Sequence, residues 1–192
     1  MKRNRDFLSK FSKQLNMIIK ISRILPNSFY LKLLKLIRSH DNIIAMFIRF
    51  LCLKNCAKSC GENVAIFSNV YLFRIHELEI GDNVSIHPLC YIDASGGITI
   101  GNDVSIAHNC TILSEEHVHS SLEKNIKDQG CELKSTSIDN NVWIGAGCRI
   151  LGGSSIKSGA IVASGAVVKN QVKQNSIVGG IPAKLIKERK AL

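Results

Sequence analysis

The sequence predicts an all-β solenoid of short parallel strands, a parallel β-helix, with a basic α-helical extension at its N-terminus. From Cys60 onward, aliphatic residues recur every six positions, which fits neither an alternating strand nor a helix of 3.6 residues per turn. The composition is 45% hydrophobic but only 6% aromatic, so the core must be aliphatic. The net charge of +10 resides in residues 1–54, which hold twelve Lys/Arg and two acids.

Residues 1–58 are predicted to be the helical extension. Its first helix is indicated by apolar residues at helical spacing, namely Leu8, Phe11, Leu15, Ile18 and Leu25. After Pro26, we expect Ser28 to cap a second helix that ends at Arg38, and Asp41 to cap a third from Asn42 to about Asn55. These helices either pack on the body and expose their basic side, or form a cationic amphipathic anchor on an anionic membrane surface through residues 1–54. Nucleic acid is not an expected partner, because no recognised motif or aromatic platform is present.

The same region lacks the signals of a spanning or exported chain. The longest apolar run, Ile43 to Leu53, is short and contains Arg49. Residues 1–10 lead into no uninterrupted apolar stretch and no cleavage-like site. The seven Cys, an odd number, are interpreted as reduced thiols. We therefore expect a cytoplasmic protein, with peripheral contact to the inner face of the membrane as the alternative.

Residues 59–192 are predicted to form the β-helix. A large aliphatic side chain points inward on each side, and a small residue four positions later fits beneath the corner; three sides close one coil of eighteen residues. Coil starts at 60, 80, 100, 138, 156 and 176 place the surplus residues after the third side each time. The largest surplus is a long loop at 114–137, and a long loop on a rigid scaffold is a common place for function.

The cysteines have different predicted roles. Three occupy the small-residue position and are predicted to be structural: Cys90, Cys110 and Cys148. Another three are spaced four apart, which resembles one face of a helix rather than a zinc motif: Cys52, Cys56 and Cys60. Cys131 lies in the long loop and is a potential nucleophile, although nothing nearby in the sequence activates it.

Two groups of histidines are candidates for chemistry. His117 and His119 stand where the long loop leaves the β-helix, beside Glu115 and Glu116. A histidine held at a rigid edge beside carboxylates can be oriented as a general base. His87 and His108 lie about one coil apart, so they are expected to approach each other closely enough for an acceptor or metal role.

The repeat and two motifs resemble the hexapeptide-repeat acyltransferases, nearest the maltose/galactoside O-acetyltransferases and the sugar O-acetyltransferases of capsule and lipopolysaccharide clusters. The motifs are Ile-Asp-Asn-Asn-Val-Trp-Ile-Gly-Ala-Gly at 138–147 and Val-Gly-Gly-Ile-Pro-Ala-Lys-Leu-Ile at 178–186. The resemblance covers residues 60–190. It implies a left-handed coil, although parallel crossovers are otherwise nearly always right-handed.

The resemblance implies transfer of an acetyl group from acetyl-CoA to a sugar or polysaccharide hydroxyl, with no metal. His117 would be the general base, and His119 is the second choice. The backbone N–H of Ala146 would face the oxyanion, and Asp93 and His87 would bind the acceptor.

The resemblance also implies where the donor binds. Trp143, Ala146 and Ser164 would border the pantetheine, and the phosphates would meet Lys169, Lys184 and Lys187. Here the family's Val-Thr-Lys-Asp-Ile-Pro-Pro is replaced by Val-Lys-Asn-Gln-Val-Lys-Gln at 168–174. Family members form homotrimers with each site between neighbouring chains.

Three alternatives stay open. One is acetylation of a small acceptor such as an antibiotic or serine. Another is a γ-type carbonic anhydrase, in which His117 and His119, with His87 or His108, would hold zinc. The last is a scaffold without activity.

Overall fold

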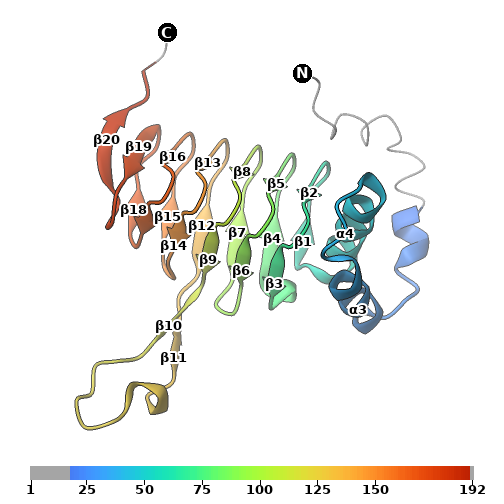
Figure 1. Cartoon of the computed structure of the whole chain (residues 1–192), viewed down its shortest axis with the longest axis horizontal. Helices are drawn as coiled ribbons and strands as arrows, with labels where there is room; N and C mark the ends of the chain where they lie inside the picture. Colours follow the sequence, from blue (N-terminus) through green and yellow to red (C-terminus); the bar gives the residue numbers. More distant parts are fainter. Residues whose placement is uncertain (1–17, 191–192) are drawn as a thin grey trace.

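The computed structural model describes residues 18–190, so Leu8, Phe11 and Leu15 of the predicted first helix lie outside the described part. Residues 18–22 are helical, and two α-helices follow, α3 (Asn27–Ile37) and α4 (Ile43–Cys56). From Ser59 the chain coils into a prism of three parallel sheets, with the helices at its N-terminal end (Figure 1). The predicted order of a helical extension followed by a β-helix is confirmed. No described helix has the length and apolar character needed to cross a bilayer.

Both predicted helix caps are wrong by one or two residues. The N-cap of α3 is Pro26, with no side-chain cap, so Ser28 lies inside the first turn. The N-cap of α4 is Asn42 rather than Asp41, because Asn42 has extended backbone angles and its side chain accepts a hydrogen bond from the N–H of Ala45.

The three faces of the prism are built from short strands in register. The first face contains β1 (Ser59–Cys60), β4 (Leu78–Ile80), β7 (Ile98–Ile100), β12 (Thr136–Ile138), β15 (Ser155–Ile156) and β18 (Gln171–Val172). The second contains β2 (Ala65–Ile66), β5 (Ser85–Ile86), β8 (Ser105–Ile106), β13 (Trp143–Ile144), β16 (Ile161–Val162), β19 (Ser176–Gly179) and the antiparallel β20 (Lys184–Glu188). The third contains β3 (Tyr71–Phe73), β6 (Tyr91–Asp93), β9 (Thr111–Leu113), β14 (Arg149–Ile150) and β17 (Val167–Val168).

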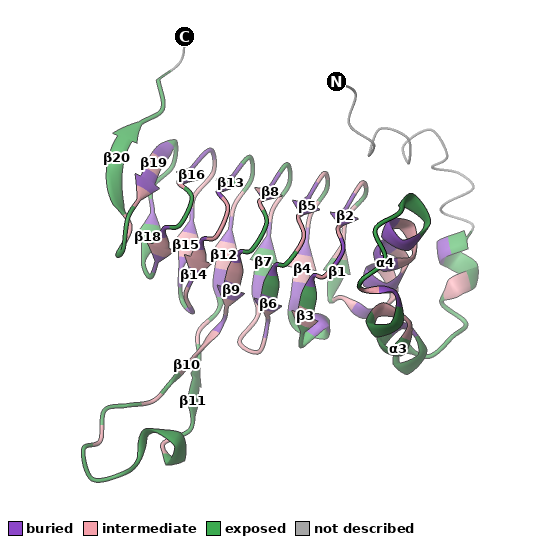
Figure 2. Ribbon diagram, in the orientation of Figure 1, coloured by how far each residue is buried: buried purple, intermediate pink, exposed green. Residues whose placement is uncertain are grey.

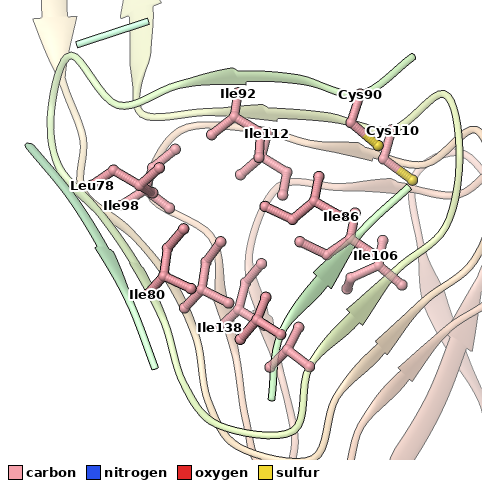
Figure 3. Packing of buried hydrophobic residues seen from close by; sticks show 14 of the residues in the cluster. Leu78, Ile80, Ile86, Cys90, Ile92, Ile98, Ile106, Cys110, Ile112 and Ile138 are labelled. Atoms are coloured by element: carbon pink, nitrogen blue, oxygen red, sulfur yellow. The ribbon is translucent and has the colours of Figure 1, made fainter. Parts of the chain in front are cut away.

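The six-residue period produces a stacked aliphatic core. Ile80 pairs with Ile100, and Ile100 with Ile138, so the inward side chains form vertical columns. Figure 3 shows these columns around the axis of the prism, with the thiols of Cys90 and Cys110 under one corner. Each coil buries its faces only against its neighbours, so the columns stabilise the coils collectively. The predicted structural role of the small-position cysteines is confirmed, since all three are buried.

The corner between the first and second faces, here the first corner, shows why glycine follows the aliphatic residue. The Asn102 carboxamide oxygen accepts a hydrogen bond from the N–H of Asp82 in the coil before it, at 2.7 Å. A Cβ at Gly81 would lie 2.3 Å from that oxygen, so only glycine leaves room for this hydrogen bond between coils. The turn itself uses left-handed residues such as Asn83, with φ of 59°.

The third corner, between the third and first faces, carries most of the irregularity, as predicted. It holds the 3₁₀ helix η1 (Ile75–Glu77) and the long loop between β9 and β12. The predicted last coil is wrong, however: Ile156 pairs with Val172, so this coil begins at 172 and not 176. Only Lys169 and Asn170 link β17 to β18, so the coil that starts at Ile156 is shorter than eighteen residues, whereas a longer one was expected.

Arg49 joins the helical region to the prism. Its side chain is 1% exposed, and its guanidinium donates hydrogen bonds to the carbonyls of Ile66, Ile37 and His40 at 2.8–3.0 Å. Cys52 and Cys56 lie in α4, but Cys60 is in β1, so the expected single helix face of three cysteines is wrong. Burial raises the pKa of Cys52 to about 12, which suits an inert packing thiol.

Candidate active site

The long loop is a hairpin that stands off the third corner. Its antiparallel strands are β10 (Glu115–His117) and β11 (Cys131–Leu133), and η2 (Ile126–Asp128) lies near its tip (Figure 1). Ser114 anchors the start of the hairpin: its hydroxyl donates a hydrogen bond to the carbonyl of Asp93 and accepts one from the N–H of Gly96, both at 2.8 Å. The start of the hairpin is therefore fixed to the preceding coil.

His117 is exposed on the hairpin and has one side-chain partner among the described residues. It lies opposite Cys131 across the two strands, and its Nδ1 is 3.5 Å from the Cys131 sulfur. If Nδ1 carries the proton and donates it toward the sulfur, Nε2 keeps a free lone pair. This arrangement suits a general base that must accept a proton from a substrate.

Glu116 does not orient His117, contrary to the expectation from their adjacency. Side chains alternate along a strand, so Glu116 points to the other side of β10. There its carboxylate lies 2.8 Å from the ammonium of Lys134, which also contacts Glu132 at 3.1 Å. The hydrogen bond from Lys134 holds the pKa of Glu116 below its ordinary value.

His119 offers the same chemistry as His117. It is exposed, and its Nδ1 lies 3.0 Å from the carbonyl oxygen of His117. A proton on Nδ1 would donate to that carbonyl and leave Nε2 free. Both imidazoles therefore remain candidates for the base.

The two predicted acceptor residues lie at different corners of one chain. Asp93 ends β6 at the third corner, where its Oδ1 accepts from the Ser95 hydroxyl at 2.6 Å and from the Ser95 N–H at 3.0 Å. His87 lies at the second corner, between the second and third faces, and stacks on Phe67 with ring centroids 4.7 Å apart.

The strand register does not put His87 and His108 at equivalent positions of their coils. The register that pairs Ile86 with Ile106 puts His87 beside Ala107. His108 comes one residue later, in the turn, where its carbonyl accepts a hydrogen bond from the N–H of Gly147 at 3.0 Å.

The second corner brings Ala146 and Ser164 together in successive coils. The carbonyl of Ala146 accepts a hydrogen bond from the N–H of Gly165 at 2.8 Å, whereas its own N–H has no hydrogen-bond partner within residues 18–190. A Cβ at Gly145 would lie 2.6 Å from the nitrogen of Ser164, so glycine permits this close stacking. An unpaired N–H is what an oxyanion donor requires.

Trp143 lies on the second face, apart from that corner. The residue is 53% exposed and lines a cavity of about 410 Å³ together with Asp103 and Arg189. Ala146 and Ser164 do not line this cavity. The predicted pantetheine residues are therefore divided between two neighbouring surfaces.

The predicted phosphate-binding lysines are partly brought together. Lys169 and Lys184 line one cavity of about 410 Å³ at the C-terminal end of the prism, and Lys173 lines it too. Lys187 lies on the exposed β20, paired with Ile177. Sequence reasoning missed Lys173, although its position in the altered stretch 168–174 was the available signal.

One chain does not assemble all these groups into a single site. The hairpin and Asp93 lie at the third corner, while Trp143 lies on the second face, which is opposite that corner in a triangular prism. Within the described residues, no group of three His, Cys, Asp or Glu side chains is placed to hold a metal ion. His87 and His117 occupy different corners, so the zinc arrangement of the carbonic anhydrase alternative does not form within one chain.

The architecture defines the class of protein: a left-handed parallel β-helix of hexapeptide repeats. Residues 135–170 match the family model described as "Bacterial transferase hexapeptide (six repeats)". Residues 135–170 therefore carry the repeat that this model describes, and the resemblance predicted from the motifs is confirmed.

Three curated relatives match over short segments. A protein of Mycobacterium tuberculosis, provisionally named an acetyltransferase, is 34% identical over 42% of this chain and 27% of its own length. A lipopolysaccharide biosynthesis O-acetyl transferase of Escherichia coli, also a provisional assignment, is 32% identical over 30% of this chain and 29% of its own. A chloramphenicol acetyltransferase of Morganella morganii is 44% identical over 28% of this chain and 26% of its own. The matched segments thus span less than a third of each relative.

Solved structures match over nearly the whole chain. A maltose O-acetyltransferase of Clostridium difficile is similar with a TM-score of 0.75 and 21% identity, over 91% of this chain and 89% of that one. A hexapeptide-repeat acetyltransferase of Vibrio cholerae, complexed with acetyl-CoA, is similar with a TM-score of 0.75 and 23% identity, over 86% and 87% of the two chains. At these identities the likeness establishes the fold.

Proposed function

We propose that the protein is an acetyl-CoA-dependent O-acetyltransferase that modifies a hydroxyl of a sugar in a bacterial surface polysaccharide or its precursor. The observation that carries this proposal is the exposed His117 imidazole, held on a hairpin of a hexapeptide prism with Nδ1 3.5 Å from the Cys131 sulfur. The names of the matched relatives and structures supply the reaction class, since they include O-acetyltransferases and an acetyl-CoA complex.

The proposed reaction is direct acyl transfer. His117 Nε2 removes the proton of the sugar hydroxyl, the oxygen attacks the thioester carbonyl, and the tetrahedral intermediate collapses with departure of the CoA thiolate. The proton then passes from His117 to that thiolate, so the products are the O-acetyl sugar and CoA. General base catalysis of this kind contributes about 10²–10⁴-fold in rate.

Two other groups assist. The unpaired N–H of Ala146 would donate to the oxyanion, and a donor of this type is worth about 3 kcal/mol. The pantetheine would follow the second corner past Ser164, and Lys169, Lys173, Lys184 and Lys187 would attract the nucleotide phosphates at the end of the prism. Asp93 and His87 would contact the acceptor.

Homotrimer formation completes this site. His117 and the surface of Trp143 and Ala146 lie on different sides of one prism, so both can face one thioester only if a neighbouring chain supplies one of them. Light scattering on the purified protein should give three times the chain mass of 21.1 kDa. A monomer that turns over acetyl-CoA would contradict the shared site.

A small acceptor is the second candidate. It is favoured by one observation, the 44% identity to chloramphenicol acetyltransferase over 54 residues. We place either reaction in the cytoplasm, where the exposed Cys131 thiol would stay reduced.

The test is a panel of acceptors supplied with acetyl-CoA. CoA release should be followed by chromatography, because Cys131 is exposed and would react with a thiol reagent. We expect CoA release that depends on maltose, a galactoside or a surface-glycan sugar, and an acetyl ester in the product by mass spectrometry. Turnover with chloramphenicol alone would favour the second candidate, and no acceptor-dependent release would contradict both.

A further inference from the structure

The helical end of the molecule exposes a group of large apolar side chains, here called the apolar cap surface. It comprises Ile18, Ile21, Ile24, Leu25 and Phe29, whose exposed fractions run from 42% to 81%. They line an open groove of about 470 Å³ together with Leu33 and Leu51. Figure 2 shows the exposed outer sides of the helices at this end of the prism. Contiguous apolar surface of this kind on a folded chain marks a contact with a partner.

The apolar cap surface is not the face with which the helices pack on the prism. That role belongs to other residues, such as Phe50 and Leu53, which are at most 1% exposed and join the core of the first coils. The outward residues come instead from the helical segment 18–22, from the turn that follows it and from the start of α3. The helices therefore have two apolar sides, and only one is covered by the described chain.

The groove contains little that could recognise a polar ligand. Ser22 is its one small polar residue, and the Ser22 hydroxyl already donates to the carbonyl of Ile19 and accepts from the Asn55 side chain. The Tyr30 hydroxyl donates to the carbonyl of Ser22. With these polar groups paired, the groove offers contact to hydrocarbon and no free hydrogen-bonding group from these side chains.

The surroundings of the groove are cationic. Residues 18–58 hold eight Lys/Arg and a single acid, Asp41. Arg49 is buried, and Lys54 and Lys58 pair with Glu62 and Glu79 on the prism. The remaining cations include four exposed side chains with no ion pair to any residue of the described chain: Lys20, Arg23, Lys32 and Lys35. Cations flanking an apolar surface are the arrangement of a helix that lies in the interface of an anionic bilayer.

We propose that the apolar cap surface docks on an anionic lipid bilayer. Ile21, Ile24 and Phe29 enter the boundary between headgroups and acyl chains, while Lys20 and Arg23 contact lipid phosphates. Like charge opposes the nearest competitors: residues 1–17 carry five Lys/Arg and one acid, and a second copy of this cap is equally cationic. An anionic partner is complementary in charge to all of these segments. The proposed docking does not depend on the proposed enzymatic activity.

The experiment is flotation of the full chain with vesicles. We expect the protein to float with vesicles of phosphatidylcholine and phosphatidylglycerol, to stay at the bottom with phosphatidylcholine alone, and to lose binding as salt rises. The double variant Ile21→Glu/Ile24→Glu should lower the bound fraction at least tenfold. The matched control is Leu122→Glu/Ile126→Glu, two exposed apolar residues on the hairpin, which should bind like the wild type.

A second variant separates lipid binding from folding. Lys20→Glu/Arg23→Glu leaves the apolar residues in place and should also weaken flotation, with an unchanged melting temperature. Equal binding of all variants, or no preference for phosphatidylglycerol, would overturn the proposal. If Ile21→Glu/Ile24→Glu lowers the melting temperature and the wild type does not float, the groove is covered by protein and the proposal is wrong.

Discussion

The prism and the hairpin contrast in how their residues are held. In the prism, Ile106 and Ile112 are fully buried and every coil is fixed by the one before it and the one after it. In the hairpin, Leu122 and Leu133 are exposed, and the strands contact chiefly each other. Yet the hairpin carries both candidate bases. The difference teaches that the repeat supplies rigidity, while its longest interruption supplies the candidate titratable groups.

Replacement of the proposed base gives the largest expected effect. His117→Ala should lower kcat by about 10²–10⁴-fold, because general base catalysis contributes that much. Its free energy of unfolding should not change measurably, since His117 is exposed and its described side-chain partner is a weak one. Turnover of acetyl-CoA and denaturant unfolding, measured on the same preparation, check both parts.

His119→Ala, two residues further along the loop, is the matched control. It should keep most of the activity and shift KM rather than kcat. The opposite pattern, with His119→Ala inactive and His117→Ala active, would exchange the roles of the two imidazoles and leave the hairpin as the site.

A core substitution should act on the free energy of unfolding, which His117→Ala is expected to leave unchanged. Ile106→Ala removes a fully buried side chain from a column, so it should reduce the free energy of unfolding by about 2–5 kcal/mol. Leu133→Ala, on the hairpin and 62% exposed, should change it by less than about 0.5 kcal/mol. Denaturant titration gives both values, and comparable losses at the two positions would break the distinction between scaffold and hairpin.

The sequence predicted the prism well because the period is a direct consequence of packing. An aliphatic residue that recurs every sixth position can be buried only if successive sides stack, so Ile80, Ile100 and Ile138 had to align. Spacing could not predict the start of the last coil, since Val172 and Ser176 both follow plausible spacings and only strand pairing distinguishes them. The predicted cap of α4 was wrong for a similar reason: Asp41 and Asn42 are both good capping residues, and the backbone angles decide between them.

The candidate site was less predictable, because its parts lie on different faces. Adjacency in sequence suggested that Glu116 would orient His117, but strand alternation separates them and Cys131 takes that position. Spacing of about one coil suggested a pair of His87 and His108, whereas the strand register places His87 beside Ala107, one residue earlier. Position along the chain shows which coil a residue occupies, but not which corner would face a neighbouring chain in the proposed trimer.

The smallest expected effect concerns the ion pair at the base of the hairpin. Lys134 contacts Glu116 and Glu132, and these hydrogen bonds raise the pKa of Lys134, while Lys134 lowers the pKa of Glu116. The lowered carboxyl pKa means that Glu116 contributes stability above its ordinary pKa of about 4.3 and loses it as pH falls further. The raised ammonium pKa means that the contribution of Lys134 is lost as pH rises through that raised value.

Lys134→Ala should therefore destabilise the protein slightly near pH 7, and the difference from wild type should vanish as the pH falls below the lowered pKa of Glu116. The effect is small because all three side chains are more than a third exposed. Lys157→Ala, which removes an exposed ion pair with Asp139 on the prism, is the control. Because only Lys134 is near the proposed base, Lys134→Ala should change kcat by up to a few-fold and Lys157→Ala should not. An equal change in kcat for both variants would mean that the hairpin holds His117 without help from this ion pair.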